Sequence, residues 1–246
     1  DGVSCGDCLS NTITKKVKTR LETDQIPSIG RTFYVSPSGT ATTCSNGAEF
    51  SVIQQAVNCA TQPGDTVLVK AGTYNQGFLI SQSGASYNYI TVRNSGNDRV
   101  VLDGTGLVDG GCIGAETQNR PCGIRITGGY VRVRGFEIQK FGNGIYAQLT
   151  AHNVIIEDNF IHDIDRTDWQ TEIRVGRWDA TDPVYVANIT IQRNTLVHVK
   201  RGQTSMSFDG LSQDNGGGHV IRNNVIRTNY WADDAHGNDC IGGHPN

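Results

Sequence analysis

Four stretches of the sequence repeat one pattern: YVRVRGFEIQKF (130–141), NVIIEDNFIHDI (153–164), NITIQRNTLVHV (188–199) and HVIRNNVIRTNY (219–230). Each stretch begins with an alternating apolar strand, passes a polar bend and continues as a second short strand. The bend residues are Gly135, Asn159, Asn194 and Asn224, with Asn94 at the same place in an earlier copy. The four later bends are 24, 35 and 30 residues apart. Repeats of this length, with Asn or Gly at a bend, indicate a solenoid of stacked coils.

Asn and Gly suit these bends because both tolerate the left-handed backbone conformation that a sharp corner requires. Asparagine side chains on successive coils can also hydrogen-bond to one another along the stack. A two-sheet sandwich would instead join its strands by tight Asn-Gly or Asp-Gly hairpins. Because the same pattern recurs in one direction here, we predict an all-β fold, a right-handed parallel β-helix.

The composition argues against several other classes of protein. Thirty Gly, one Met and 18% charged residues are untypical of a helical bundle. The net charge of -3, from 21 basic and 24 acidic residues, gives no strong field to attract nucleic acid or an anionic membrane. No apolar run approaches the roughly 20 residues of a membrane-spanning helix.

The first part of the chain differs from the repeats. Residues 1–30 are polar and basic with a weak helical period, and we predict an N-terminal arm or cap there. After a strand that starts at Arg31, apolar residues recur at a helical spacing and end at a Pro-Gly pair. These residues are Phe50, Ile53, Ala56, Val57 and Ala60. We expect the β-helix to cover residues 31–246 and to lack its C-terminal coils or cap.

Four segments of this region resemble a known group: TFYVSPSG (32–39), IQQAVNCATQPGDTVLVKAGTY (53–74), ITVRN (90–94) and VVLDG (100–104). They are similar to the N-terminal half of secreted right-handed β-helix proteins of the pectate-lyase-like superfamily, and closest to polysaccharide lyase family nine. The resemblance covers about residues 31–246. It implies an extracellular protein that acts on a polysaccharide, with a short N-terminal helix, Phe50 to Ala60, that caps the first coil.

Five aspartates surround the last apolar run of the repeats: Asp209, Asp214, Asp233, Asp234 and Asp239. Asp209 and Asp233 are 24 residues apart, like Gly135 and Asn159, so we predict that they lie on neighbouring coils with Asp234 beside them. Two carboxylates about 5 Å apart repel by roughly 3 kcal/mol. Either one takes a proton or a cation neutralises them, and Ca²⁺ suits such oxygen ligands. The alternative is that they are solvated loop aspartates.

The resemblance to family nine implies a calcium site and a reaction. The matching metal ligands in this chain are Asp209, Asp233, Asp234 and Asp239. The reaction is a β-elimination, in which a Lys or Arg near the metal removes the proton α to a uronate carboxylate. The family's lysine would fall beyond Asn246, so Lys200 and Arg201 are the candidate bases. The alternative for this pair is a solvated position at a coil edge.

An insertion between two repeats, DRTDWQTEIRVGRWDATDP (165–183), is rich in aromatic and basic residues. Loops inserted between β-helix coils can wall a saccharide groove. Aromatic faces stack on sugar rings, and Arg forks pair with uronate carboxylates. We predict substrate contacts from Trp169, Arg174, Arg177 and Trp178, or else tryptophans folded back onto apolar coil surface.

Seven cysteines indicate an oxidising, extracellular environment. The predicted disulfides are Cys44–Cys59, Cys112–Cys122 and Cys5–Cys8. The last pair is a C-x-x-C, which favours a structural bridge over zinc because no second C-x-x-C or His cluster accompanies it. Cys240 then remains for an intermolecular bridge, a free thiol or a partner absent from the chain. Asn188 opens an N-glycosylation signal, which applies if the source is eukaryotic.

Two functional hypotheses follow. The first is a secreted, calcium-dependent lyase acting on an acidic polysaccharide, or a hydrolase or epimerase with the same groove. The second is a non-catalytic structural, adhesive or fibre-forming β-helix that assembles with other chains. An open coil edge after the last repeat and the left-over Cys240 favour the second. Nucleic-acid binding is disfavoured because the sequence has no basic stripe.

Overall fold

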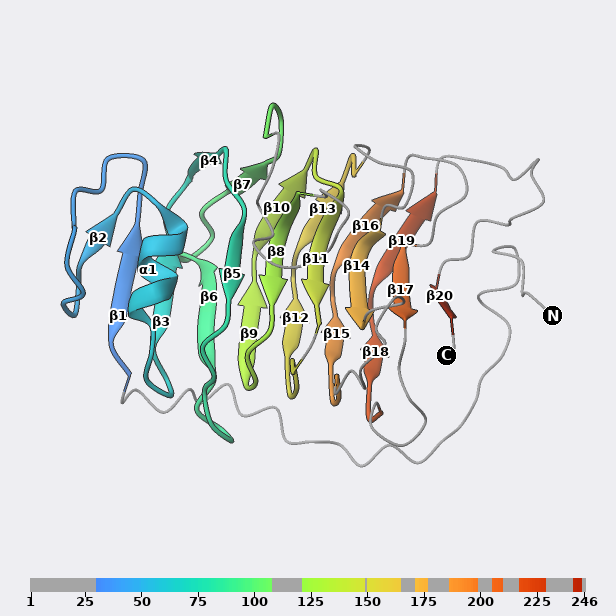
Figure 1. The fold of residues 1–246 in the computed structure, drawn as a ribbon. Helices are drawn as coiled ribbons and strands as arrows, with labels where there is room; N and C mark the ends of the chain where they lie inside the picture. Colours follow the sequence, from blue (N-terminus) through green and yellow to red (C-terminus); the bar gives the residue numbers. More distant parts are fainter. Residues whose placement is uncertain are drawn as a thin grey trace.

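The computed structural model describes residues 30–107, 121–148, 150–164, 171–176, 186–198, 205–209, 217–228 and 241–244. These residues form three parallel sheets, and the chain visits the sheets in turn around each coil (Figure 1). The prediction of a parallel β-helix is confirmed. Of the predicted N-terminal arm, residues 1–30, only Gly30 lies within the described residues.

The strands of the three sheets, here called A, B and C, stack along the long axis of the molecule (Figure 1). Sheet A contains β1 (Thr32–Val35), β2 (Glu49–Phe50), β3 (Thr66–Val69), β6 (Ile90–Asn94), β9 (Val131–Arg134), β12 (Ile155–Glu157), β15 (Thr190–Gln192) and β18 (Val220–Arg222). Sheet B contains β4 (Gly72–Tyr74), β7 (Val100–Asp103), β10 (Phe136–Gln139), β13 (Phe160–His162), β16 (Thr195–His198) and β19 (Val225–Thr228). Sheet C contains β5 (Phe78–Ile80), β8 (Cys122–Ile126), β11 (Asn143–Ala147), β14 (Thr171–Gly176), β17 (Met206–Asp209) and β20 (Ile241–His244).

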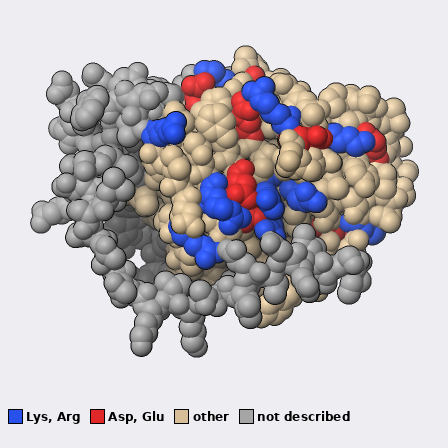
Figure 2. Space-filling model, turned by 180° about the vertical axis from the view of Figure 1, so that it is seen from behind, with Lys and Arg blue, Asp and Glu red and all other residues tan. Residues whose placement is uncertain are grey.

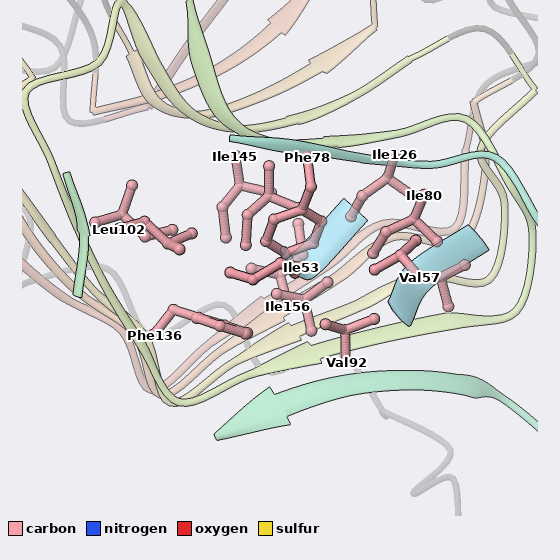
Figure 3. Close-up of a cluster of buried hydrophobic side chains, with 14 of the residues drawn as sticks. Ile53, Val57, Phe78, Ile80, Val92, Leu102, Ile126, Phe136, Ile145 and Ile156 are labelled. Carbon is pink, nitrogen blue, oxygen red and sulfur yellow. The ribbon is translucent and has the colours of Figure 1, made fainter. Parts of the chain in front are cut away.

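The core fills the inside of the coils. Alternate side chains of each strand point inward, because the side-chain period of a strand is two. In sheet A they form a continuous row through Val92, Val133, Ile156 and Ile191, all fully buried. Figure 3 shows inward side chains of all three sheets meeting in one cluster. Each such side chain contributes about 1.5–3 kcal/mol through burial.

The corner between sheets A and B carries the predicted ladder of asparagines. The Nδ2 of Asn159 donates to Oδ1 of Asn194, and Nδ2 of Asn194 donates to Oδ1 of Asn224, each over 3.0 Å. The backbone N–H of Phe136 donates to Oδ1 of Asn159 over 3.0 Å. The backbone of each coil is therefore tied to the side chain of the next, and every rung satisfies buried polar groups.

Gly135 does not belong to this ladder. Phe136 is the residue level with Asn159, because Glu137 pairs with Phe160. Gly135 instead has the positive φ (79°) that Asp158 has on the next coil (54°). That coil is 23 residues long, since Arg132 pairs with Ile155, and not the predicted 24.

Near the N-terminal end, helix α1 (Ile53–Cys59) buries Ile53, Ala56 and Val57. The helical spacing predicted from Phe50 begins three residues later, because Phe50 pairs with Val35 as part of β2. The predicted disulfide between Cys44 and Cys59 is present, with the Cα atoms 5.3 Å apart. No helix in the described part of the chain is long and apolar enough to span a bilayer.

Candidate functional site

The outer face of sheet C carries a row of polar side chains. Arg125 of β8, Tyr146 of β11 and Arg174 of β14 are level on three neighbouring coils. They alternate along their strands with residues of the core, so they lie on the outside of the coil. All three are nevertheless buried, with exposed fractions of 6%, 1% and 5%. Long polar side chains on an outer face are usually solvated, so their burial marks this row as unusual.

The members of the row contact one another. The guanidinium carbon of Arg174 lies 5.1 Å from the centre of the Tyr146 ring, a cation–π distance. When the Gln148 amide is oriented by its hydrogen bonds, its nitrogen donates to the Tyr146 hydroxyl over 3.0 Å. Its oxygen then accepts from the Arg125 guanidinium. The tyrosine is thus held between two cations.

This arrangement suits the recognition of a planar anion. A guanidinium can pair with a carboxylate through two parallel hydrogen bonds, and burial strengthens such contacts because solvent screening is weak. The fixed aromatic ring adds an apolar face and a hydroxyl. We call this row the sheet C site (Arg125, Tyr146, Gln148 and Arg174), and it combines the two kinds of group, guanidinium and aromatic ring, that recognise a sugar carboxylate.

Asp209 lies on the same sheet, one row beyond Arg174. Its Cα is level with Gly176 of β14 and His244 of β20. The predicted length of 24 residues for the next coil is therefore wrong, whereas the placement of Asp233 beside Asp209 remains a prediction, because Asp233 lies outside the described residues. The coil that follows β17 is 35 residues long, so the residue level with Asp209 is His244. The error came from taking the shortest repeat as the length of this coil.

The calcium ligand set remains a prediction. Among the described residues no group of three or more His, Cys, Asp or Glu side chains could hold a metal ion. Several predicted site residues lie outside the described residues: Trp169, Arg177, Trp178, Lys200, Arg201, Asp233, Asp234 and Asp239. The same is true of Cys5, Cys8, Cys112 and Cys240.

Three other predicted residues are described. Arg174 belongs to strand β14, although the sequence placed it in an inserted loop. Cys122 forms a disulfide, and its predicted partner is outside the described residues. Asn188 is exposed, at a corner where its φ is 54°, and its glycosylation remains a prediction.

His219 stands between sheets C and A, just before β18. Its ring centre lies 5.4 Å from that of Phe208, the residue before Asp209. Burial lowers its pKa, which keeps the imidazole neutral near pH 7. The backbone N–H of Ile189 lies 3.3 Å from Nδ1, which places the ring proton on Nε2. His219 can therefore donate a hydrogen bond without carrying a charge.

Sequence reasoning missed Arg125, Tyr146 and Gln148. The sequence does contain a pattern that could have found them. In the segments CGIRI (122–126), NGIYA (143–147) and TEIRV (171–175), inward-facing and outward-facing residues alternate in the same phase. Aligned on the central Ile, they place Arg, Tyr and Arg at the same position. The segments are short and unequally spaced, so the repeats of sheets A and B hide them.

Comparison with known proteins places this fold. No family model matches the chain. Pectate lyase L of Dickeya dadantii (strain 3937) is 27% identical over an alignment that covers 65% of this chain and 36% of the lyase. The chain therefore spans about a third of the length of that relative.

Two solved structures share the architecture. Pectate lyase Pel9A aligns with a TM-score of 0.57 at 19% identity, covering 89% of this chain and 62% of its own. A rhamnogalacturonan lyase aligns with a TM-score of 0.51 at 13% identity, covering 87% of this chain and 63% of its own. At these identities the structures support the fold and leave the chemistry to be argued from residues.

Proposed function

Because the chain is a pectate-lyase-like parallel β-helix protein, we propose that it is a secreted, calcium-dependent lyase that cleaves an acidic polysaccharide by β-elimination. The observation that carries the proposal is the buried Arg–Tyr–Arg row on the sheet that also bears Asp209. A uronate polymer offers a carboxylate on each sugar, which is the group this row suits.

The sheet C site would bind the substrate. Arg125 and Arg174 would hold uronate carboxylates, and the Tyr146 ring between them would fix the orientation of a sugar. Such binding raises the rate when it positions the proton α to the carboxylate for removal. Negative charge that develops on the carboxylate would also be stabilised by the nearby guanidinium groups.

The metal and the base come from the resemblance to family nine. A bound Ca²⁺ would supply positive charge to neutralise a uronate carboxylate. Its ligands would be the carboxylates of Asp209, Asp233, Asp234 and Asp239, hard oxygen donors that suit the ion. Lys200 or Arg201 would remove the α-proton. Helix α1 would cap the first coil, as in that superfamily.

The test is an ultraviolet assay for unsaturated product on polygalacturonate and alginate, with and without calcium. We expect calcium-dependent product from one of the two polymers. Arg174→Gln should reduce the rate, whereas Arg99→Gln, a change at an exposed residue just before β7, should not. No product from either polymer, with calcium bound, would favour a non-catalytic binding module.

The metal assignment is tested separately by calorimetry with calcium. Asp209→Ala, and Asp233→Ala together with Asp234→Ala, should each abolish binding. Asp163→Asn, which changes a partly exposed aspartate at the end of β13, is the matched control. Unchanged binding in both site variants would show that the ligands lie elsewhere.

A further inference from the structure

The outer face of sheet A carries a second group of arginines. Arg93 of β6 and Arg134 of β9 are level on neighbouring coils, and Arg132 lies two residues before Arg134. All three alternate with core valines, so they lie on the outside of the coil. Together with Arg193 and Arg222 they form what we call the arginine cluster.

Two carboxylates of the described residues neutralise part of this positive charge. Glu157, fully buried, accepts from Arg132 and, over 2.7 Å, from Arg193. Asp158 pairs with Arg134 over 3.0 Å and with Arg193 over 2.8 Å. Among the described residues these two carboxylates contact three of the arginines, Arg132, Arg134 and Arg193.

Among the described residues of this face, the excess of positive over negative charge is greatest around Arg93. Its guanidinium donates to the backbone carbonyl of Asn94 over 3.3 Å. The pKa of Arg93 is lowered, first by partial burial and then by repulsion from Arg134 and Arg132. On the following coil the same row holds a carboxylate, since Glu157 is level with Arg134. An acidic residue beside an arginine is the usual way to neutralise such a row.

Like charges level on adjacent strands reduce stability, because the strands are only about 4.8 Å apart. Placing two arginines level on adjacent strands does not stabilise the sheet by itself. It becomes favourable when an external anion lies across the arginines. Figure 2 shows basic side chains gathered around a smaller acidic patch near the middle of one face.

We propose that the arginine cluster is a second polyanion-binding surface, which holds the carboxylates of an acidic polysaccharide on sheet A while the sheet C site acts on the polymer. The cluster is partly exposed, with 45% of the Arg134 side chain and 38% of the Arg193 side chain accessible. Both can therefore reach an external chain without a rearrangement of the coil. The choice of polymer class rests on the proposed function.

The cluster would act as an anchor. A polymer long enough to reach both sheets would bind more tightly than a short oligomer, because the second contact becomes intramolecular. A trimer that fits one site would gain nothing from sheet A. Chain length is therefore the variable that separates this surface from the sheet C site.

The experiment measures binding of fluorescently labelled polygalacturonate, long chain and trimer, at low ionic strength with a chelator present. Removing calcium suppresses cleavage, so the result does not depend on catalysis. The test variant is Arg93→Gln with Arg134→Gln. The control is Arg99→Gln with Arg227→Gln, which removes the same charge from two exposed positions, one just before β7 and one on β19. We expect the test variant to raise the Kd for the long chain roughly tenfold, with a weaker salt dependence.

Three results would overturn the proposal: an unchanged Kd in the test variant, an equal loss in the control, or tighter binding of DNA than of polygalacturonate by the wild-type protein. Thermal unfolding excludes a merely structural role, because Arg93→Gln should keep or raise the Tm. A lowered Tm together with lost binding would assign the effect to misfolding and count against the surface. Loss of long-chain binding with normal calcium-dependent cleavage of the trimer would support the anchor and the lyase separately.

Discussion

The outer faces of sheets A and C both carry arginines, but they place them differently. On sheet C two guanidiniums are buried and separated by a tyrosine ring, one of them 5.1 Å from its centre. On sheet A two arginines, Arg93 and Arg134, are level with each other, and the cluster around them is partly exposed and includes two carboxylates. Burial and fixed neighbours give directional recognition of one anion, whereas exposed charge in excess gives weak, salt-sensitive attraction to many.

The largest expected effect concerns the buried acid of sheet A. Glu157→Gln removes the carboxylate that Arg132 and Arg193 share, and Gln192 also donates to it over 2.6 Å. We expect a loss of about 3 kcal/mol or more in the free energy of unfolding, because breaking a buried pair leaves uncompensated charge. Urea denaturation measures this. A loss below that of Glu49→Gln, at an exposed pair, would show that Glu157 is not the centre of the face.

The next effect concerns the sheet C site. Arg174→Gln should lower kcat/KM by about 100-fold, the size expected when a fixed donor to developing charge is lost. Arg174→Lys keeps the charge but not the fork, and should recover only part of the activity. Steady-state kinetics on the cleaved polymer measure both. Full activity in Arg174→Lys would mean that sheet C, like sheet A, acts through charge alone.

A smaller effect lies between the two faces, at His219. Burial lowers the pKa of this histidine in the folded protein, so the unfolded chain binds the proton more readily. Its contribution to stability is therefore complete above the ordinary value of 6.5 and decreases as the pH falls below it. His219→Asn, which keeps an acceptor for the Ile189 N–H, should flatten that decrease. Unfolding free energies across this pH range provide the measurement, and an unchanged slope would assign the pH dependence to other groups.

The smallest effect is expected at Arg93. Arg93→Gln relieves repulsion from Arg134 and should change the free energy of unfolding by no more than about 0.5 kcal/mol, in the stabilising direction. Thermal melts at low and high salt measure it, and the gain should shrink at high salt. A clear loss of stability would mean that Arg93 supports the sheet, and that the two faces differ less than proposed.

The repeats predicted sheets A and B well because their strands share one sequence pattern on every coil. Sheet C was not predicted, since its strands stand among segments of unequal length. The error at Gly135 shows the limit more sharply. A glycine and an asparagine at similar bends look equivalent in sequence, but one takes the left-handed position and the other takes the ladder position after it.

The candidate site was only partly predictable for a related reason. Arg174 was selected as a groove residue, but its neighbours Tyr146 and Arg125 come from coils 28 and 49 residues earlier, and neither spacing occurs among the 24, 35 and 30 residues that separate the bends used to predict the repeats. Their burial depends on what packs over sheet C, which alternation along a strand does not reveal.

The asparagine ladder also determines where this protein can change length. Successive coils of 23, 35 and 30 residues have the same spacing in sheet A and in sheet B. In these three coils all variation in length therefore falls outside the corner that joins the two sheets. A residue inserted beside Asn194 would turn the outer side chains of β16 inward, while a loop added between sheets B and C would leave every rung in place. The ladder keeps the strands of sheets A and B in register, so the loops elsewhere on these coils can differ in length without shifting that register.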